Sequence, residues 1–228
     1  MNGELIITDD VPGVFASTFL DALAQSNSPR HCVALSGGDT ARACYERLVG
    51  DDRVDQIDWS SVDFYWGDER CVSCTSVDSN QRLARESLLE HLVQIRGAFP
   101  MACASKPGGG LSPQSYQLLI ERVPEFDIVH LGMGPDGHTA SLFAGSEALH
   151  APPDVLVLET EDPTRRMAHP RITLTLNALT KARLAIFTVS GSSKRDAMQA
   201  LLAGEDIPAA RVRAGRIVWI ADAEACPP

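Results

Sequence analysis

Several features that would place this chain in a special class are missing from its sequence. Basic residues are in the minority, since 20 Lys and Arg stand against 30 Asp and Glu, a formal net charge of −10. Nucleic acids and anionic membranes both favour a basic surface. No apolar run approaches the roughly 18 residues that span a bilayer, and the N-terminus lacks the basic and apolar segments of a secretory signal. We therefore expect a cytoplasmic protein with no nucleic-acid or membrane partner.

The sequence also lacks a recognisable disulfide or metal pattern. Its six cysteines are scattered along 228 residues, a chain long enough to bury a core without covalent cross-links. Cys71 and Cys74 form one C-x-x-C pair, but neither a second pair nor histidines at ligand spacing accompany it. We predict that Cys71 and Cys74 are reduced loop residues that bind no metal.

Short β-branched apolar runs alternate with helical patterns along the whole chain. HCVALSGG precedes the helical stretch DTARACYERLVG, FDIVHLGMG is largely apolar, and LAIFTVSG precedes SSKRDAMQALLAG. Apolar strands separated by helices are typical of a parallel sheet that is buried on both faces. No internal repeat or long Pro, Gly or Ser linker interrupts the pattern. We predict one α/β domain over residues 1–228, with a mostly parallel sheet covered by helices on both faces.

Four of the predicted strands end in glycines or charged residues. These ends are LSGGDT at 35–40, WGDER at 66–70, GMGPDGH at 132–138 and VSGSSK at 189–194. Taken singly, each is compatible with a tight turn or a solvated charge run. In an open α/β sheet, however, the carboxyl ends of parallel strands meet at one edge, where ligands bind. The convergence of all four ends predicts a binding site at that edge.

The third of these ends presents a histidine on an unusual turn. Its three glycines permit positive φ angles and a close approach of the backbone to a ligand. We predict that the turn holds His138 at the rim of the sheet. An imidazole, with an unperturbed pKa of about 6.5, is suited there to act as a general base. Asp136 could hydrogen-bond the ring and set its tautomer, and Asp68 is the competing candidate.

The first and fourth ends are suited to an anion. Ser36, Gly37 and Gly38 open a helix, whose N–H groups and dipole attract phosphate. The loop is neither a Walker A motif nor a dinucleotide fingerprint. Lys194 lies in the first turn of another predicted helix, where its charge opposes the dipole unless an anion is close. Asp39 would repel a nearby phosphate, so we expect its side chain to turn away and cap the helix.

From the SGG loop to the C-terminal RIVWIAD, the chain resembles the 6-phosphogluconolactonase family. The most specific pieces are WGDERCV with DSN following, FDIVHLGMGPDGHTASLF, and RITLTLNAL followed by VSG-x-x-K. The resemblance implies the fold shared with glucosamine-6-phosphate deaminases and ribose-5-phosphate isomerases. It also implies hydrolysis of 6-phosphoglucono-δ-lactone to 6-phosphogluconate in the oxidative pentose phosphate pathway, without metal or cofactor.

The resemblance also assigns roles by position. His138 matches the family's catalytic histidine, and Asp68 and Arg70 match its active-site pair. The residues then expected at the substrate's phosphate are Ser36, Gly37, Gly38, Thr40, Arg171 and Lys194. The segment TRRMAHPRIT lacks the family's run of prolines, so Arg165 and Arg166 remain open as further phosphate contacts.

Two other functions remain compatible with the sequence. One is a phosphosugar isomerase or deaminase on the same fold, with Asp68 as its carboxylate base. After Asp-Gly-His, however, the deaminase motif continues Ile-Ala-Phe-Asn-Glu, whereas this chain continues Thr-Ala-Ser-Leu-Phe. The other is a phosphosugar sensor without catalysis. An acyl-enzyme on Ser141 is not expected, because G-x-S-x-G is absent. We expect a monomer or a small homo-oligomer whose partner is a small phosphosugar lactone.

Overall fold

The computed structural model describes residues 1–26, 28–104, 109–165 and 169–227, and within them the strands form two sheets. The larger sheet has seven parallel strands in the order β1-β10-β9-β6-β2-β3-β5. Its strands are β1 (Glu4–Ile7), β2 (His31–Leu35), β3 (Val62–Trp66), β5 (Gly97–Phe99), β6 (Phe126–Gly132), β9 (Ala182–Val189) and β10 (Arg216–Ala221). The smaller antiparallel sheet comprises β4 (Asp68–Arg70), β8 (Arg171–Leu174) and β7 (Val157–Thr160).

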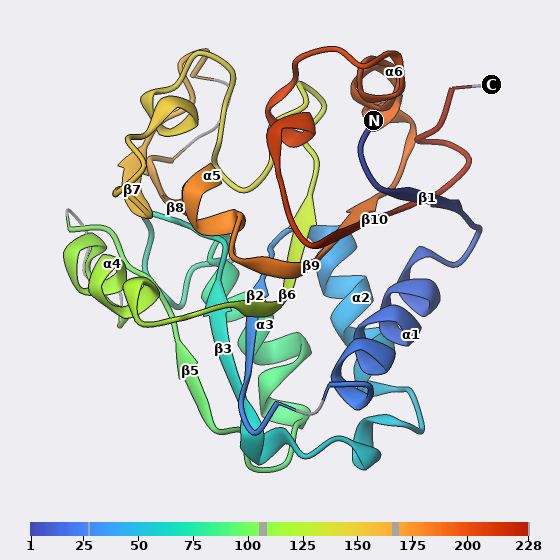
Figure 1. Cartoon of the computed structure of the whole chain (residues 1–228), viewed down its shortest axis with the longest axis vertical. Helices are drawn as coiled ribbons and strands as arrows, with labels where there is room; N and C mark the ends of the chain where they lie inside the picture. Colours follow the sequence, from blue (N-terminus) through green and yellow to red (C-terminus); the bar gives the residue numbers. More distant parts are fainter. Residues whose placement is uncertain (27, 105–108, 166–168, 228) are drawn as a thin grey trace.

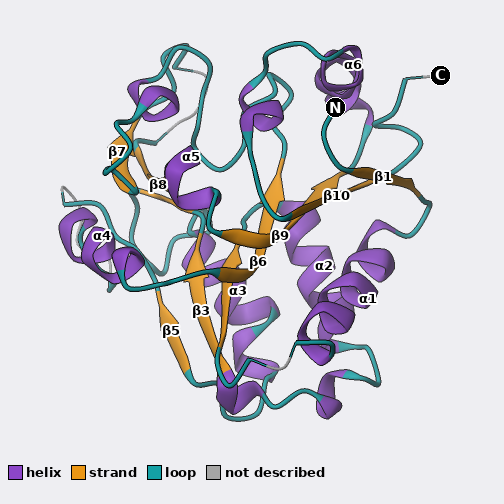
Figure 2. Cartoon of the chain, viewed as in Figure 1, coloured by secondary structure: helices purple, strands orange, loops and turns teal. Residues whose placement is uncertain are grey.

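Helices connect most of the parallel strands (Figure 2). The α-helices are α1 (Val11–Ala24), α2 (Asp39–Val49), α3 (Asn80–Ser87), α4 (Pro113–Glu121), α5 (Leu176–Leu179) and α6 (Arg195–Ala203). Short 3-10 helices are η1 (Val54–Gln56), η2 (Trp59–Ser61), η3 (Leu89–His91), η4 (Glu147–His150), η5 (Ser192–Lys194) and η6 (Pro208–Arg211). None of the helices in the described part of the chain is both long and apolar enough to cross a membrane.

The strand order explains why both faces of the sheet are covered. From β1 through β2 and β3 to β5 the chain moves towards one edge, whereas β6, β9 and β10 return in the opposite direction. Because crossovers between parallel strands are right-handed, the reversal places α1 to α3 on one face and α4 to α6 on the other. Figure 1 shows α1 and α6 on opposite sides of β10. The prediction of a mostly parallel sheet with helices on both faces is therefore confirmed.

The apolar strands form the centre of the core. All five residues of β2 and of β3 are buried, as are the first six residues of β6. The α1 helix begins after Asp10, whose carboxylate accepts a hydrogen bond from the Gly13 N–H at 2.9 Å, and it buries Phe15 and Phe19 against the sheet. Strands buried on both faces have no polar side to expose, which accounts for their continuous apolar runs.

The structure corrects the prediction for one of the two loop cysteines. Cys71 forms a disulfide with Cys103, with their Cα atoms 5.3 Å apart, while Cys74 is free. The parallel pairing of β3 with β5 brings their carboxyl ends together, with Tyr65 opposite Phe99. Each cysteine follows one of these ends by a few residues. The two thiols therefore meet through strand pairing, which their spacing in the sequence does not reveal.

The chain reversal also places a crevice in the sheet. Strand β2 leads to β3 on one side, and its other neighbour, β6, leads on to β9 in the opposite direction. A crevice opens outside the carboxyl ends of two such strands. The loops that follow β2 and β6 contain the SGG and GMGPDGH motifs. The topology therefore brings the two most glycine-rich loops of the sequence to the same place.

Candidate active site

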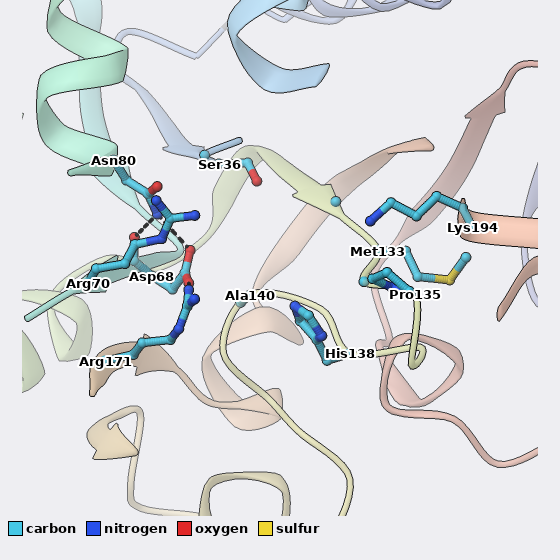
Figure 3. A pocket seen from close by; sticks show the side chains of 13 residues that line it. Ser36, Asp68, Arg70, Asn80, Met133, Pro135, His138, Ala140, Arg171 and Lys194 are labelled. Carbon is cyan, nitrogen blue, oxygen red and sulfur yellow. Dashed lines mark hydrogen bonds and ion pairs between the residues drawn. The ribbon is translucent and has the colours of Figure 1, made fainter. Parts of the chain in front are cut away.

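A pocket occupies this crevice and collects residues from all four strand ends singled out in the sequence (Figure 3). Its lining residues are Ser36, Gly37, Asp68, Arg70, Asn80, Gly132, Met133, Gly134, Pro135, His138, Ala140, Arg171 and Lys194. An adjoining hollow shares Ser36, Gly37, Gly132, Met133 and Lys194 with the pocket. Its other lining residues are Gly38, Asp39, Thr40, Ala41, Thr188, Ser190 and Ser193. The two spaces together run from the start of α2 to β4 and β8.

The turn after β6 holds His138 through a small number of tight contacts. The Gly134 N–H donates to the His138 carbonyl at 2.8 Å, and the Gly137 N–H donates to the Gly134 carbonyl at 3.0 Å. Gly137 has a φ of +80°, and a Cβ atom on Gly134 would collide with the His138 ring. Glycine is therefore required at 137 for conformation and at 134 for space. The predicted role of the glycines in presenting His138 agrees with this geometry.

Asp136 is the carboxylate that contacts the histidine. Its Oδ1 atom is hydrogen-bonded to His138 Nδ1 and also accepts the His138 backbone N–H at 3.2 Å. Burial opposes ionisation of Asp136, but the hydrogen bond and charge of His138 outweigh it and lower the pKa of Asp136 to about 2. An ionised Asp136 fixes the proton of His138 on Nδ1, so Nε2 is left as the basic atom. Of the two candidate carboxylates, Asp136 is the one that the structure places against the ring.

Asp68 instead lies in a buried hydrogen-bond network, with 6% of its surface exposed. Its Oδ1 accepts from Asn80 Nδ2 at 3.0 Å, and its Oδ2 accepts from the Ser141 hydroxyl at 2.6 Å. Arg171 Nη1 lies 3.5 Å from the same Oδ2. Ser141 follows the His138 turn and is fully buried. Asp68 therefore links that turn to β4 and β8.

Glu69, the second carboxylate of WGDER, has a structural role. It is buried and accepts the backbone N–H groups of Asn80 at 2.8 Å and Gln81 at 2.7 Å, together with the Ser79 hydroxyl at 3.0 Å. Burial raises the pKa of Glu69, although these hydrogen bonds oppose the shift. A carboxylate at the N-terminus of α3 also interacts favourably with the helix dipole. Glu69 thus anchors α3, whose first residue, Asn80, lines the pocket.

Two arginines lie opposite each other on neighbouring strands at the Asp68 end of the pocket. In the register of β4 with β8, Arg70 lies opposite Arg171, and both line the pocket. The Nε atoms of both are buried and lack a hydrogen-bond partner among the described residues. Burial lowers the pKa of Arg171, and Arg70 adds to this effect against the influence of Asp68. Two neighbouring guanidinium groups on the wall of one pocket favour an anionic or oxyanion ligand.

The opposite end of the pocket is formed by the SGG loop and Lys194. Gly38 is the N-cap residue of α2 with a φ of +91°, and no side chain caps the helix. The expectation that Asp39 caps it is wrong: Asp39 is exposed and is itself the first residue of α2. The uncapped helix start adjoins Lys194, which points into the pocket in Figure 3. Burial lowers the pKa of Lys194, although Asp136 opposes the shift.

The structure divides the predicted phosphate residues between the two ends. Gly38 and Thr40 line only the hollow near Lys194, whereas Arg171 lines only the pocket near Asp68. Arg165 is exposed and lines neither space, and Arg166 lies outside the described residues. Asn80 is a lining residue that the sequence analysis did not single out, although it belongs to the DSN segment.

Known proteins are similar to this chain in sequence. A family model described as glucosamine-6-phosphate isomerases/6-phosphogluconolactonase matches residues 8–219. A 6-phosphogluconolactonase from Mycobacterium leprae is 33% identical over 225 residues, which cover 92% of this chain and 89% of that protein. One from Synechocystis sp. is 33% identical over 207 residues, covering 85% of this chain and 82% of that protein.

Solved structures have the same architecture. The crystal structure of a 6-phosphogluconolactonase from Thermotoga maritima superposes with a TM-score of 0.84 at 26% identity, covering 97% of this chain and 100% of that one. A monomeric glucosamine-6-phosphate deaminase has a TM-score of 0.76 at 18% identity, covering 99% of this chain and 98% of that one, and shares the fold alone. The family match over most of the sequence and the relatives at 33% identity lead to one conclusion. The chain belongs to the glucosamine-6-phosphate isomerase/6-phosphogluconolactonase family.

Proposed function

We propose that the protein hydrolyses 6-phospho-D-glucono-1,5-lactone to 6-phospho-D-gluconate, a step of the oxidative pentose phosphate pathway. The observation that carries the proposal is the position of the His138–Asp136 pair. It lies in a pocket with an uncapped helix start and Lys194 at one end and two arginines at the other. The names of the relatives at 33% identity support the same activity.

The substrate's phosphate fits best in the hollow at the start of α2. A helix N-terminus offers N–H groups and a favourable dipole to an anion, and Lys194 supplies a full positive charge beside it. Thr40 adds a hydroxyl to the lining of the hollow. The phosphate would then hold the sugar ring in the pocket, so that its lactone carbon is oriented with respect to His138.

His138 would act as a general base on water. Neutral Nε2 takes a proton from a water molecule as the water oxygen attacks C1 and forms a tetrahedral intermediate. When the bond between C1 and the ring oxygen breaks, the imidazolium returns the proton to that oxygen, giving the free carboxylic acid and a hydroxyl group. Asp136 holds the ring in the required tautomer and stabilises the transient imidazolium. Such a base typically contributes about 10²–10⁴-fold to the rate.

Arg70 and Arg171 would stabilise negative charge at C1. In the transition state the carbonyl oxygen becomes an oxyanion, and after hydrolysis the product has a carboxylate at the same carbon. The guanidinium groups of these arginines line the pocket, and their positive charge suits both species. Arg171 was expected at the phosphate, but its position beside Asp68 and Arg70 favours the lactone end. Asp68 and Asn80 would then hold the arginine pair and the adjoining SGG loop in place.

The isomerase or deaminase alternative is less consistent with the site. A proton shuttle between two sugar carbons requires a carboxylate that is free to accept a proton. Asp68, the candidate for that base, already accepts hydrogen bonds from Asn80 and Ser141 and lies beside Arg171. The structural likeness to the deaminase is one of fold alone. Metal independence, a cytoplasmic location and a monomeric or small oligomeric state remain predictions from the sequence.

The deciding experiment measures hydrolysis of freshly generated lactone against its spontaneous rate, with EDTA present. We expect fast, EDTA-insensitive turnover by the wild type and a loss of about 10²–10⁴-fold, the range typical of a general base, in His138→Ala. A His138→Ala protein that kept more than about a tenth of the rate would exclude the general-base role. A wild type that binds 6-phosphogluconate without accelerating hydrolysis would point to the sensor function instead.

A further inference from the structure

A buried hydrogen-bond network lies directly beneath the SGG loop. His130, on β6, is fully buried, and both of its ring nitrogens have partners. Nδ1 lies 3.0 Å from the Tyr45 hydroxyl, and Nε2 lies 2.9 Å from Thr188 Oγ1. Tyr45 belongs to α2. Thr188 belongs to β9 and lines the hollow at the start of α2, which we call the phosphate hollow. The network therefore joins the three elements whose ends form that hollow.

The network reaches the loop through the backbone of a single residue. The Tyr45 hydroxyl accepts the Ser36 N–H at 2.8 Å and lies 3.2 Å from the Ser36 carbonyl oxygen. One phenol thus holds the peptide groups on both sides of the Ser36 Cα atom. The next residue, Gly37, packs so closely on Asn80 that a Cβ atom would overlap the amide of Asn80. A displacement of Ser36 would therefore move the start of the phosphate hollow and disturb Asn80 as well.

His130 is suited to hold the phenol without bringing a charge into the core. Burial lowers the pKa of His130 to about 3, so its ring is neutral near pH 7. In either tautomer the ring has a partner for each nitrogen, because hydroxyl groups can donate or accept. The rings of Tyr45 and His130 also pack edge to face, with centroids 5.4 Å apart. The phenol consequently has a fixed position from which to bind Ser36.

We propose that Tyr45 and His130 are positioning residues for the substrate's phosphate, acting through the backbone of Ser36. The proposal rests on the proposed function in one respect, namely that the hollow at the start of α2 receives the phosphate. Neither side chain lines the pocket or the hollow, so neither contacts the substrate itself. Their contribution is to keep Ser36 and the N–H groups that follow it in the geometry that an anion requires.

Substitution of Tyr45 by Phe tests the positioning role of Tyr45, because it removes only the hydroxyl group that binds Ser36. We expect the Kd for 6-phosphogluconate, measured by calorimetry, to rise about tenfold, since the N–H of the half-buried Ser36 loses its partner. KM for the lactone should rise by a similar factor, while kcat changes little, because His138 and the arginine pair are untouched. Thermal unfolding and circular dichroism establish that the variant is folded at the assay temperature.

Tyr116→Phe is the matched control. Tyr116 is equally buried, and its hydroxyl accepts the Trp66 N–H at 2.8 Å and lies 3.3 Å from the Trp66 carbonyl oxygen. It therefore makes the same kind of contact at the end of strand β3, with a residue that lines neither the pocket nor the hollow. We expect Tyr116→Phe to lose stability but to bind 6-phosphogluconate with the wild-type Kd. Equal weakening in both variants would overturn the proposal, because it would indicate a general effect of lost stability.

A second pair of variants tests His130. Asparagine at 130 places an amide near the position of Nδ1, facing Tyr45, whereas glutamine places it near Nε2, facing Thr188. We expect His130→Asn to retain wild-type affinity and His130→Gln to lose about threefold, because only the former keeps a partner for the phenol. Lactone hydrolysis is measured on the same samples. Absent turnover with normal product binding would refute the lactonase function alone, whereas unchanged affinity in Tyr45→Phe would refute the positioning role alone.

Discussion

Replacement of Asp136 tests how this carboxylate orients the His138 ring and stabilises a positive charge on it. One oxygen of Asp136 accepts hydrogen bonds from both Nδ1 and the backbone N–H of His138. Asparagine can leave its amide oxygen at that position, because an NH₂ group there would face the donating backbone N–H. Asp136→Asn therefore preserves the tautomer of His138 and removes mainly the negative charge. Asp136→Ala removes both the charge and the hydrogen bond that orients the ring.

The size of each effect follows from these contacts. A hydrogen bond to a charged group contributes about 1.5–3 kcal/mol and a neutral one about 0.5–1.5 kcal/mol, so loss of the charge costs about 1–1.5 kcal/mol. Because 30% of the Asp136 side chain is exposed, solvent screening favours the lower part of this range. We expect kcat for the lactone to fall up to about tenfold in Asp136→Asn and roughly 10²-fold in Asp136→Ala.

Stopped-flow or pH-indicator assays of lactone hydrolysis provide the measurement, with His138→Ala as the lower limit. The expected order of rates is wild type, Asp136→Asn, Asp136→Ala and His138→Ala. Glu147→Gln, at a carboxylate that lines neither the pocket nor the hollow, serves as a control for charge removal. Equal rates in Asp136→Ala and the wild type would refute the reasoning, because the carboxylate would then have no part in orienting or charging the base.

Two further predictions concern stability. The disulfide between Cys71 and Cys103 spans 32 residues in the sequence, so Cys103→Ser should lower the free energy of unfolding by about 3–4 kcal/mol in urea titrations. Cys74→Ser should leave it unchanged, and an unaffected Cys103→Ser would argue against the cross-link. The pKa of His130 is about 3 in the folded state but about 6.5 in an unfolded chain, so below pH 6.5 the unfolded state binds the extra proton. The stabilising contribution is complete above that pH and is lost progressively towards pH 3, by about 2 kcal/mol between pH 6.5 and pH 5. His130→Asn should reduce this pH dependence, and an identical slope in the variant would contradict the burial of a neutral imidazole.

The sequence by itself determined the fold class and indicated which strand ends form the candidate site. Apolar strands alternating with helices specify a parallel sheet, because only strands buried on both faces lack a polar side. The glycines around Asp136 and His138 identify a turn that presents His138, and the structure adds that the Gly134 backbone lies against the His138 ring. Residues from each of the strand ends at 35–40, 66–70, 132–138 and 189–194 line the pocket or the adjoining hollow, because parallel strands have their carboxyl ends at one edge of the sheet.

Only the tertiary structure decided which partner each polar group takes. Asp68, Glu69 and Arg70 are consecutive, yet Asp68 joins the Ser141 network, Glu69 anchors α3 and the Arg70 guanidinium donates to the Asp78 carbonyl. The disulfide to Cys103 and the link from His130 to Ser36 likewise depend on contacts between segments far apart in the chain. Local sequence sets backbone conformation and burial through short-range sterics and hydrophobic periodicity. Partner choice among polar side chains depends on strand order and register, which arise only when the whole sheet has assembled.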